Sequence, residues 1–316
     1  MLEFVGRFRD VILSRGRSIK HAEDTFRRVI TVLQDAAISD VTAMRATQVE
    51  LGIGRLRTRG LSLASCNDHL RAVKSFSRFL FLDAITPHDS LAKLKLFNVQ
   101  KDKRHARRAL SLDECTRLLD AARTGRVVRH MTGKARFALY LLALTSGLRS
   151  NELRHLSVAD LVLSDKGPMV RLDAKFTKDG CDACLPIPAM TRHAILDATA
   201  GKRFSDAMFD MPQPSRVVMM LRTDLAVAGV EYQNDRKEFA DFHSLRHTYL
   251  TQLAKLTHDV KLVQSLARHS TVTLTMDKYC HSDASEQRKA VDSLGKLLNG
   301  QSRDRTGDTR IFSPVL

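Results

Sequence analysis

Five side chains in the second half of the chain are of the types that can hold a phosphate group and react with it. Arg149 lies in the segment TSGLRSNEL, His243 and Arg246 in FHSLRHT, and His269 and Tyr279 in ARHSTVTLTMDKYCH. A guanidinium group can donate two parallel hydrogen bonds to phosphate oxygens. A tyrosine hydroxyl, with an ordinary pKa of about 10, becomes a useful nucleophile only where nearby positive charge favours its phenolate form. Together these residue types suit covalent chemistry on a phosphodiester.

The elements expected around these residues would hold them in defined places. A Ser-Gly pair at 146–147 interrupts an apolar run and should place Arg149 at the turn into the next helix. His243 and Arg246 are three residues apart, so a helix would carry both on one face.

Each residue alone also has an ordinary structural explanation. Arg149 could pair with Glu152, His243 could be a hydrogen-bonded histidine of the core, and Tyr279 could pack on an amphipathic helix. The occurrence of all three segments in this order favours one shared site. In residue type, order and separation they resemble the tyrosine recombinase (phage integrase) family, across roughly residues 105–295 and more loosely across the region before them.

This resemblance implies a role for each residue. Arg149 and Arg246 correspond to the family's phosphate-clamping arginines, and His243 and His269 to its two active-site histidines. Tyr279 corresponds to the nucleophile, which forms a 3′-phosphotyrosine with DNA. In this interpretation His243 assists proton transfer at the nucleophile and His269 hydrogen-bonds the phosphate. Because covalent capture conserves the energy of the broken bond, rejoining needs neither ATP nor a divalent metal, and we expect no cofactor.

The family also places a lysine on a β-hairpin, where it protonates the leaving 5′-oxygen. Lys178 matches the family's spacing, since it lies eight residues before Pro186. Lys175 stays open as the alternative, because the sequence does not fix the register of the hairpin. Two departures from the family pattern stand out. The hairpin after Lys178 lacks the further basic residues common in relatives, and Arg268 occupies a position that is usually glycine, where it would either crowd the turn or add a phosphate contact.

The composition favours a polyanionic partner. Among 316 residues, 51 Lys and Arg against 35 Asp and Glu give a formal charge of +16 and a pI near 10.0. Each phosphate neutralised by Lys or Arg releases condensed counterions, so this excess favours double-stranded DNA. No apolar run reaches membrane-spanning length, and the N-terminal MLEFVGRFRD does not fit a signal peptide. The five sparse cysteines indicate reduced thiols, and we expect a cytoplasmic, nucleoid-associated protein. Cys181 and Cys184 lack a second ligand pair, so we expect no metal site.

Hydrophobic periodicity predicts a mainly helical chain. Residues 18–35 and 62–83 carry apolar side chains at helical spacing, the second run with Ser62 in the N-cap position. A capping-box pattern at 111–114 opens a second domain, whose core should contain a very apolar helix over about 134–145. The segments MVRL and CLPI, with a Lys-Asp-Gly turn between them, predict a small antiparallel hairpin.

We therefore expect a helical N-terminal core-binding domain and a mostly helical catalytic domain with a small antiparallel β-sheet. The expected boundaries are 1–100 for the first domain, 101–109 for a basic linker, 110–299 for the catalytic domain and 300–316 for a disordered tail. The basic side chains expected to face DNA, although a solvated surface would explain them too, are Arg71, Lys74, Arg78, Lys101, Lys103, Arg104, Arg107 and Arg108.

The resemblance implies a site-specific DNA recombinase or integrase that acts as a homotetramer on two DNA sites, with accessory directionality or host factors as further partners. Because no extra domain precedes the first helical one, a simple integrase, resolvase or transposon-type enzyme is favoured over recombinases that bind distant arm sites. Two alternatives stay open: a topoisomerase IB-like nicking-closing enzyme that acts as a monomer, and a non-catalytic DNA-binding relic. The target sequence and the choice between integration, excision and resolution cannot be read from these patterns.

Overall fold

The computed structural model describes residues 1–177, 180–257, 259–268, 288 and 292. The chain divides into two compact units, one from Met1 to His105 and one from Ala106 onwards. The division falls inside the basic segment 101–109, which contains the end of a 3-10 turn at Val99–Asp102 and the short strand β1 (Ala106–Arg107). The tail expected at 300–316 lies outside the described residues.

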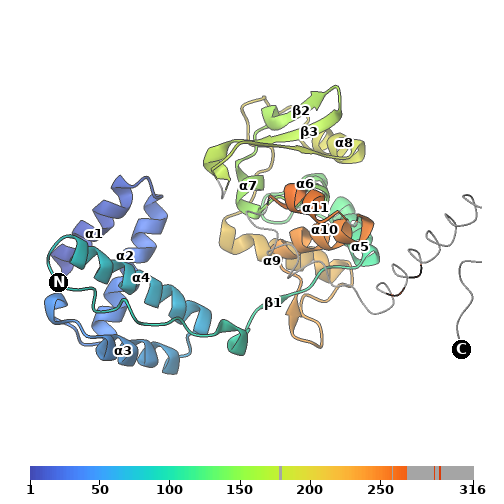
Figure 1. Ribbon diagram of the computed structural model, residues 1–316. Helices are drawn as coiled ribbons and strands as arrows, with labels where there is room; N and C mark the ends of the chain where they lie inside the picture. The colour runs from blue at the N-terminus through green and yellow to red at the C-terminus, as the bar shows by residue number, and fades with distance from the viewer. Residues whose placement is uncertain (178–179, 258, 269–287, 289–291, 293–316) are drawn as a thin grey trace, which may run out of the picture. The chain divides into compact units, whose positions relative to one another are not determined.

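The first unit is helical (Figure 1). Its elements are α1 (Leu2–Ser14), α2 (Ile19–Asp35), a 3-10 turn at Val41–Ala43, α3 (Ala46–Thr58) and α4 (Leu63–Leu82). The hydroxyl of Ser62 accepts a hydrogen bond from the backbone of Ser65, as expected of an N-cap. Phe8 and Phe76 pack with ring centroids 5.5 Å apart in a core to which all four helices contribute. The two helices predicted in this region are therefore confirmed.

The second unit is mostly helical, with short strands. The helices in its described part are α5 (Leu112–Thr124), α6 (Gly133–Ser146), α7 (Ser150–His155), α8 (Ala189–Ala198), α9 (Pro214–Val227), α10 (Phe242–Leu256) and α11 (Val260–Ala267), and 3-10 turns occur at Val158–Asp160 and Ala174–Phe176. The strands after β1 are β2 (Leu161–Ser164), β3 (Gly167–Leu172), β4 (Ala183–Pro186) and β5 (Glu238–Phe239). The capping box predicted at 111–114 is present at the start of α5.

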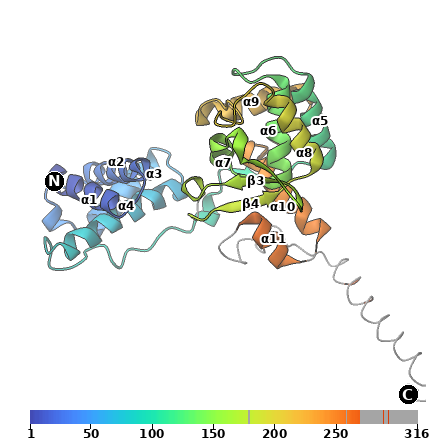
Figure 2. The same ribbon diagram turned by 90° about the horizontal axis from the view of Figure 1, so that it is seen from above.

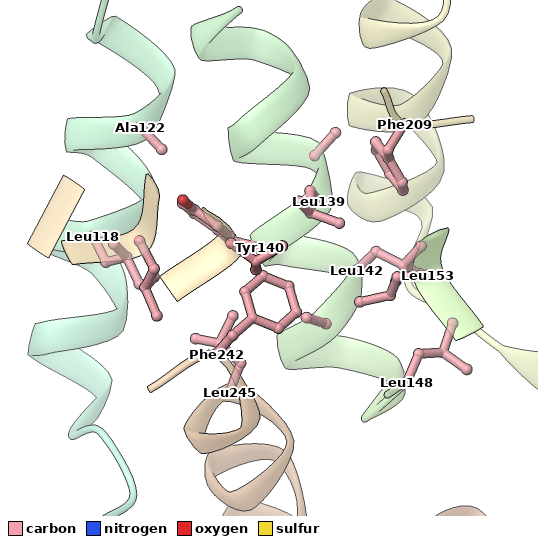
Figure 3. Packing of buried hydrophobic residues seen from close by; sticks show 14 of the residues in the cluster. Leu118, Ala122, Leu139, Tyr140, Leu142, Leu148, Leu153, Phe209, Phe242 and Leu245 are labelled. Carbon is pink, nitrogen blue, oxygen red and sulfur yellow. The ribbon is translucent and has the colours of Figure 1, made fainter. Parts of the chain in front are cut away.

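Helix α6 is the centre of this unit, as its apolar sequence predicts. It packs against α5, α8 and α10, and its side chains Leu139, Tyr140 and Leu142 are fully buried. Figure 3 shows Tyr140 beside Phe242 of α10, with ring centroids 6.3 Å apart. Because α6 ends at Ser146, the buried helix delivers the chain directly to the turn that carries Arg149.

A buried polar network fixes α6 against α9. The guanidinium of Arg136 donates two hydrogen bonds to the carboxylate of Asp224, at 2.8 and 3.0 Å, and the hydroxyl of Tyr140 donates a third at 2.7 Å. A buried charge is tolerated where an opposite charge and hydrogen bonds satisfy it. This network gives Tyr140 a structural partner deep in the core.

The sheet lies on one side of the second unit (Figure 1), and Figure 2 shows strands β3 and β4 next to each other. Strands β3 and β4 pair antiparallel with Met169 opposite Pro186 and Leu172 opposite Ala183, which confirms the predicted hairpin. Strand β2 adds a third strand, antiparallel to β3, that the two predicted segments did not include. The register leaves Lys175 in the connection between these two strands, and Lys178 lies outside the described residues. In the described part of the chain, no helix is long and apolar enough to cross a lipid bilayer.

Candidate active site

Arg149 lies at the turn between α6 and α7. Gly147 ends α6 in the left-handed conformation, with φ of 64°, and Arg149 is the N-cap residue of α7. A Cβ atom on Gly147 would lie 2.3 Å from Cδ1 of Tyr249, so this position requires glycine for its space as well as for its backbone conformation. The turn predicted from the Ser-Gly pair is confirmed.

The carboxylate of Glu152 holds Arg149 in place. The backbone N–H of Arg149 donates to Oε2 of Glu152 at 2.7 Å, and Nη1 of its guanidinium donates to Oε1 at 2.8 Å. Nη2 of Arg268 donates to the same Oε2 at 2.6 Å. The side chain of Glu152 is only 1% exposed. Burial would raise the pKa of Glu152, but the hydrogen bonds and positive charge of the two arginines outweigh it and lower the pKa. One ionised carboxylate therefore joins two guanidinium groups.

Arg246 lies on α10 and is 3% exposed. Its Nη1 donates to the carbonyl oxygen of Gly147 at 2.5 Å, and its Nη2 donates to the carbonyl oxygen of Ala267 at the end of α11. These acceptors lie two residues before Arg149 and one residue before Arg268. The guanidinium of Arg246 thus connects the two loops that carry the other arginines, and all three belong to one neighbourhood.

His243 lies in the first turn of α10, after the N-cap Asp241. Although the residue is exposed, the protein around it and the positive charges of Arg107, Arg246 and Arg149 lower the pKa of its imidazole to about 4, against the opposing charge of Asp241. The carboxylate of Asp241 accepts a hydrogen bond from Nε of Arg107 at 2.6 Å. A ring near three guanidinium groups is disfavoured as a cation. At neutral pH this imidazole is therefore uncharged.

Lys175 lies in the loop of the hairpin, beside the site. Its Nζ is 2.7 Å from Oδ2 of Asp173 and 4.8 Å from the ring centroid of Phe176, whose ring stacks on His155 at 4.2 Å. A pocket of about 250 Å³ includes Lys175 and Glu152 in its lining. The other candidate, Lys178, lies outside the described residues, as do His269 and Tyr279.

The three tyrosines that the structure describes have hydroxyl groups with raised pKa. Burial is the main reason for the raised pKa of the hydroxyl groups of Tyr140, Tyr232 and Tyr249. The Asp224 carboxylate raises the pKa of Tyr140 further. At Tyr249 the charges of Arg246 and Arg268 act in the opposite direction without reversing the shift. The surroundings of these three hydroxyl groups therefore disfavour their ionised form.

The basic side chains proposed to face DNA differ in their surroundings. Arg108 is mostly buried and donates to both carboxylate oxygens of Glu114 at 2.9 Å, so it serves the fold of the second unit. Several others make contacts inside their own unit: Arg71 with Asp68, Lys74 with the carbonyl of Ala92, Arg78 with the ring of Phe81, Arg104 with the carbonyl of Gly60 and Arg107 with Asp241. Lys101 and Lys103 are exposed.

Cys181 and Cys184 are exposed. Among the residues whose positions are described, no three His, Cys, Asp or Glu side chains come together as a metal site would require.

The sequence suggested a pair between Arg149 and Glu152, which the structure contains, and it left open whether Arg268 crowds the turn or adds a phosphate contact. The structure adds that Glu152 is shared between Arg149 and Arg268. The sequence feature that pointed to a role for Arg268 was an arginine at a position that is usually glycine in the family.

The chain is similar to known proteins in both sequence and fold. The model of the "Phage integrase family" matches residues 108–286, more than half of the chain. The tyrosine recombinase XerC of Pseudomonas putida is 26% identical over 283 residues, which cover 87% of this chain and 89% of the relative.

Solved structures share the fold. The Tn1549 transposon integrase in complex with a circular intermediate DNA superposes with a TM-score of 0.69 at 17% identity, covering 93% of this chain and 98% of that one. A lambda integrase tetramer bound to a Holliday junction gives a TM-score of 0.66 at 16% identity, covering 89% of this chain and 78% of that one.

Proposed function

The chain belongs to the phage integrase family, and we propose that it cleaves DNA with Tyr279, on a phosphate held by Arg149 and Arg246. It is a tyrosine-type site-specific recombinase, an enzyme that cleaves and rejoins DNA. The observation that carries the residue assignment is the hydrogen bond from Arg246 to the carbonyl oxygen of Gly147, because it brings the second guanidinium to the turn that carries the first.

The proposed reaction conserves the number of phosphodiester bonds. The hydroxyl oxygen of Tyr279 attacks the phosphorus, the bond to the 5′-oxygen breaks, and a 3′-phosphotyrosine forms. Arg149 and Arg246 stabilise the charge that develops on the non-bridging oxygens. His243, whose pKa is lowered to about 4, is neutral and accepts the tyrosine proton. Lys178, or Lys175 as the alternative, supplies a proton to the leaving oxygen, and His269 hydrogen-bonds the phosphate.

The proposed partners follow from charge and from the relatives. A formal charge of +16 favours duplex DNA, and the lambda integrase relative is described as a tetramer on a Holliday junction. We therefore propose a homotetramer that bridges two DNA sites in the nucleoid, assisted by accessory factors. Residues 1–100 would bind the core DNA, 101–109 would join the domains, and 110–299 would carry the chemistry. The exposed lysines Lys101 and Lys103 are the basic side chains of the linker best placed for a phosphate backbone.

A two-stage experiment tests this function. First, the full chain is incubated with nicked duplexes from a randomised pool, and DNA that becomes covalently attached is sequenced to define a half-site. Second, plasmids with two such sites are incubated with the protein in EDTA. The expected result is exchange of flanking DNA with wild type and none with Tyr279→Phe. Relaxation of a one-site plasmid without any exchange would favour a nicking-closing enzyme instead, and a strict need for Mg²⁺ would contradict the proposed chemistry.

A further inference from the structure

Arg268 occupies a backbone conformation that L-residues rarely adopt. It is the C-cap residue of α11, with φ of 51° and ψ of 49°, in the left-handed region. Glycine adopts this conformation without steric cost, whereas a Cβ atom makes it unfavourable. A strained residue of this kind persists where the surrounding structure or a function compensates for it. The side chain of Arg268 is therefore expected to do something that glycine cannot.

The Arg268 side chain points inward and is incompletely hydrogen-bonded. Only 7% of it is exposed, and its Nη2 donates to Oε2 of Glu152 at 2.6 Å. Its Nε and Nη1 are buried and have no hydrogen-bond partner among the residues that the structure describes. Buried donors without partners are rare in proteins and are costly when the group is charged. Two guanidinium donors are thus available to an acceptor that the described residues do not supply.

The surroundings favour an anion as that acceptor. Glu152 is the one carboxylate hydrogen-bonded to both Arg149 and Arg268 among the described residues, so the three side chains together carry an excess positive charge. Arg246 adds a further positive charge, since it donates to the carbonyl of Ala267, the residue next to Arg268. A carboxylate shared between two arginines also neutralises each of them less than a dedicated partner would.

We propose that Arg268 is a third arginine of the phosphate site, whose Nη1 donates to a non-bridging oxygen of the scissile phosphate while Nη2 stays on Glu152. This rests on the proposed function of the site. It assigns a substrate contact to a position where a glycine could provide only the turn.

The competing explanation is that Arg268 only holds Glu152, and through it Arg149. The two explanations differ in their dependence on the charge of the phosphate. A direct contact with a phosphate oxygen weakens when that oxygen is replaced by an uncharged methyl group, whereas a contact confined to the protein does not.

The first measurement is the single-turnover rate at which the full chain attaches to the nicked half-site recovered from the randomised pool. Arg268→Gly relieves the backbone strain and should fold, yet we expect it to slow attachment by at least about tenfold, with Arg268→Lys intermediate. Arg129→Gly is the matched control, because Arg129 also has a positive φ of 50° but is exposed and lies in the loop between α5 and α6. We expect its rate to equal that of wild type.

The second measurement is the affinity for the same half-site carrying either a phosphate or a methylphosphonate at the scissile position. It is made in the Tyr279→Phe background, so that no reaction interferes. We expect wild-type Arg268 to prefer the phosphate, and Arg268→Gly to reduce that preference several-fold. An unchanged preference, or an unchanged attachment rate, overturns the proposal for Arg268. A wild-type protein that attaches to no DNA in the pool would instead overturn the proposed function, so the two failures are distinguishable.

Discussion

The guanidinium of Arg246 donates a 2.5 Å hydrogen bond to the carbonyl oxygen of Gly147, across 99 residues of sequence. This bond joins helix α10 to the end of helix α6, two residues before Arg149. The separation between the two proposed phosphate-binding arginines is thus set by the backbone of a turn. Changes in that turn should affect stability and phosphate binding together.

Gly147→Ala tests the turn. The added Cβ would lie 2.3 Å from the ring of Tyr249, and φ of 64° disfavours any side chain. We expect a loss of about 2–4 kcal/mol in the free energy of unfolding, from overpacking and backbone strain together. Gly167→Ala is the control, because Gly167 has φ of 106° but no atom within 4 Å of its added Cβ. Urea unfolding should show the smaller loss for the control, and equal losses would mean that the contact with Tyr249 is unimportant.

Glu152→Ala tests the shared carboxylate. It leaves Arg268, which is 7% exposed, and the partly exposed Arg149 without their anion. Removal of one member of a buried ion pair costs about 3–5 kcal/mol, and we expect the lower end because Arg149 reaches solvent. Asp197→Ala breaks the exposed pair with Lys134 and should cost less than about 1 kcal/mol. Thermal or urea unfolding of the two variants measures the difference, and a cost at Glu152 as small as at Asp197 would contradict the shared role.

His243 should make the protein less stable in mild acid. Its pKa is lowered from 6.5 to about 4 in the folded protein, so as pH falls the unfolded chain binds the proton first. Stability attributable to this group is complete above pH 6.5 and is lost between pH 6.5 and about 4. We expect His243→Gln to lose less stability than wild type over that interval. Urea midpoints measured across the interval test this, and parallel curves for the two proteins would show that the ring titrates normally.

Tyr140→Phe should lower the stability of the fold without changing the rate of covalent attachment to DNA. The hydroxyl of Tyr140 donates to the buried carboxylate of Asp224, and loss of a hydrogen bond to a charged group costs about 1.5–3 kcal/mol. Because this hydroxyl belongs to the core, the folded variant should still attach covalently to DNA at the wild-type rate. Loss of attachment in a variant shown by circular dichroism to be folded would assign Tyr140 a part in the reaction.

Local patterns predicted much of the fold. The helices at 18–35 and 62–83, the capping box at 111–114 and the buried α6 follow from periodicity and capping, which involve neighbours in sequence. Strand β2 was not predicted, because its pairing with β3 depends on contacts beyond a short apolar alternation. The basic segment 101–109 was predicted to be a linker from its charge and its place between two regular segments, and neither feature reveals that Arg108 pairs with Glu114.

The site was predictable in its residue types and less so in its connections. The order of the three segments indicated Arg149, His243 and Arg246, and the structure brings these three into one neighbourhood. The sharing of Glu152 with Arg268 could not be predicted, since it requires α11 to end beside α7, 116 residues apart in the chain. A carboxylate three residues after an arginine suggests only a local pair.

The most direct test of the central claim is to identify the amino acid that carries the DNA. Covalent complexes formed on the recovered half-site in EDTA are digested, and the peptide that bears the nucleotide is sequenced by mass spectrometry. The prediction is a single modified peptide, with the 3′-phosphate on Tyr279. A nucleotide on Tyr140, Tyr232, Tyr249 or any serine, or a complex that forms equally well with Tyr279→Phe, would contradict it.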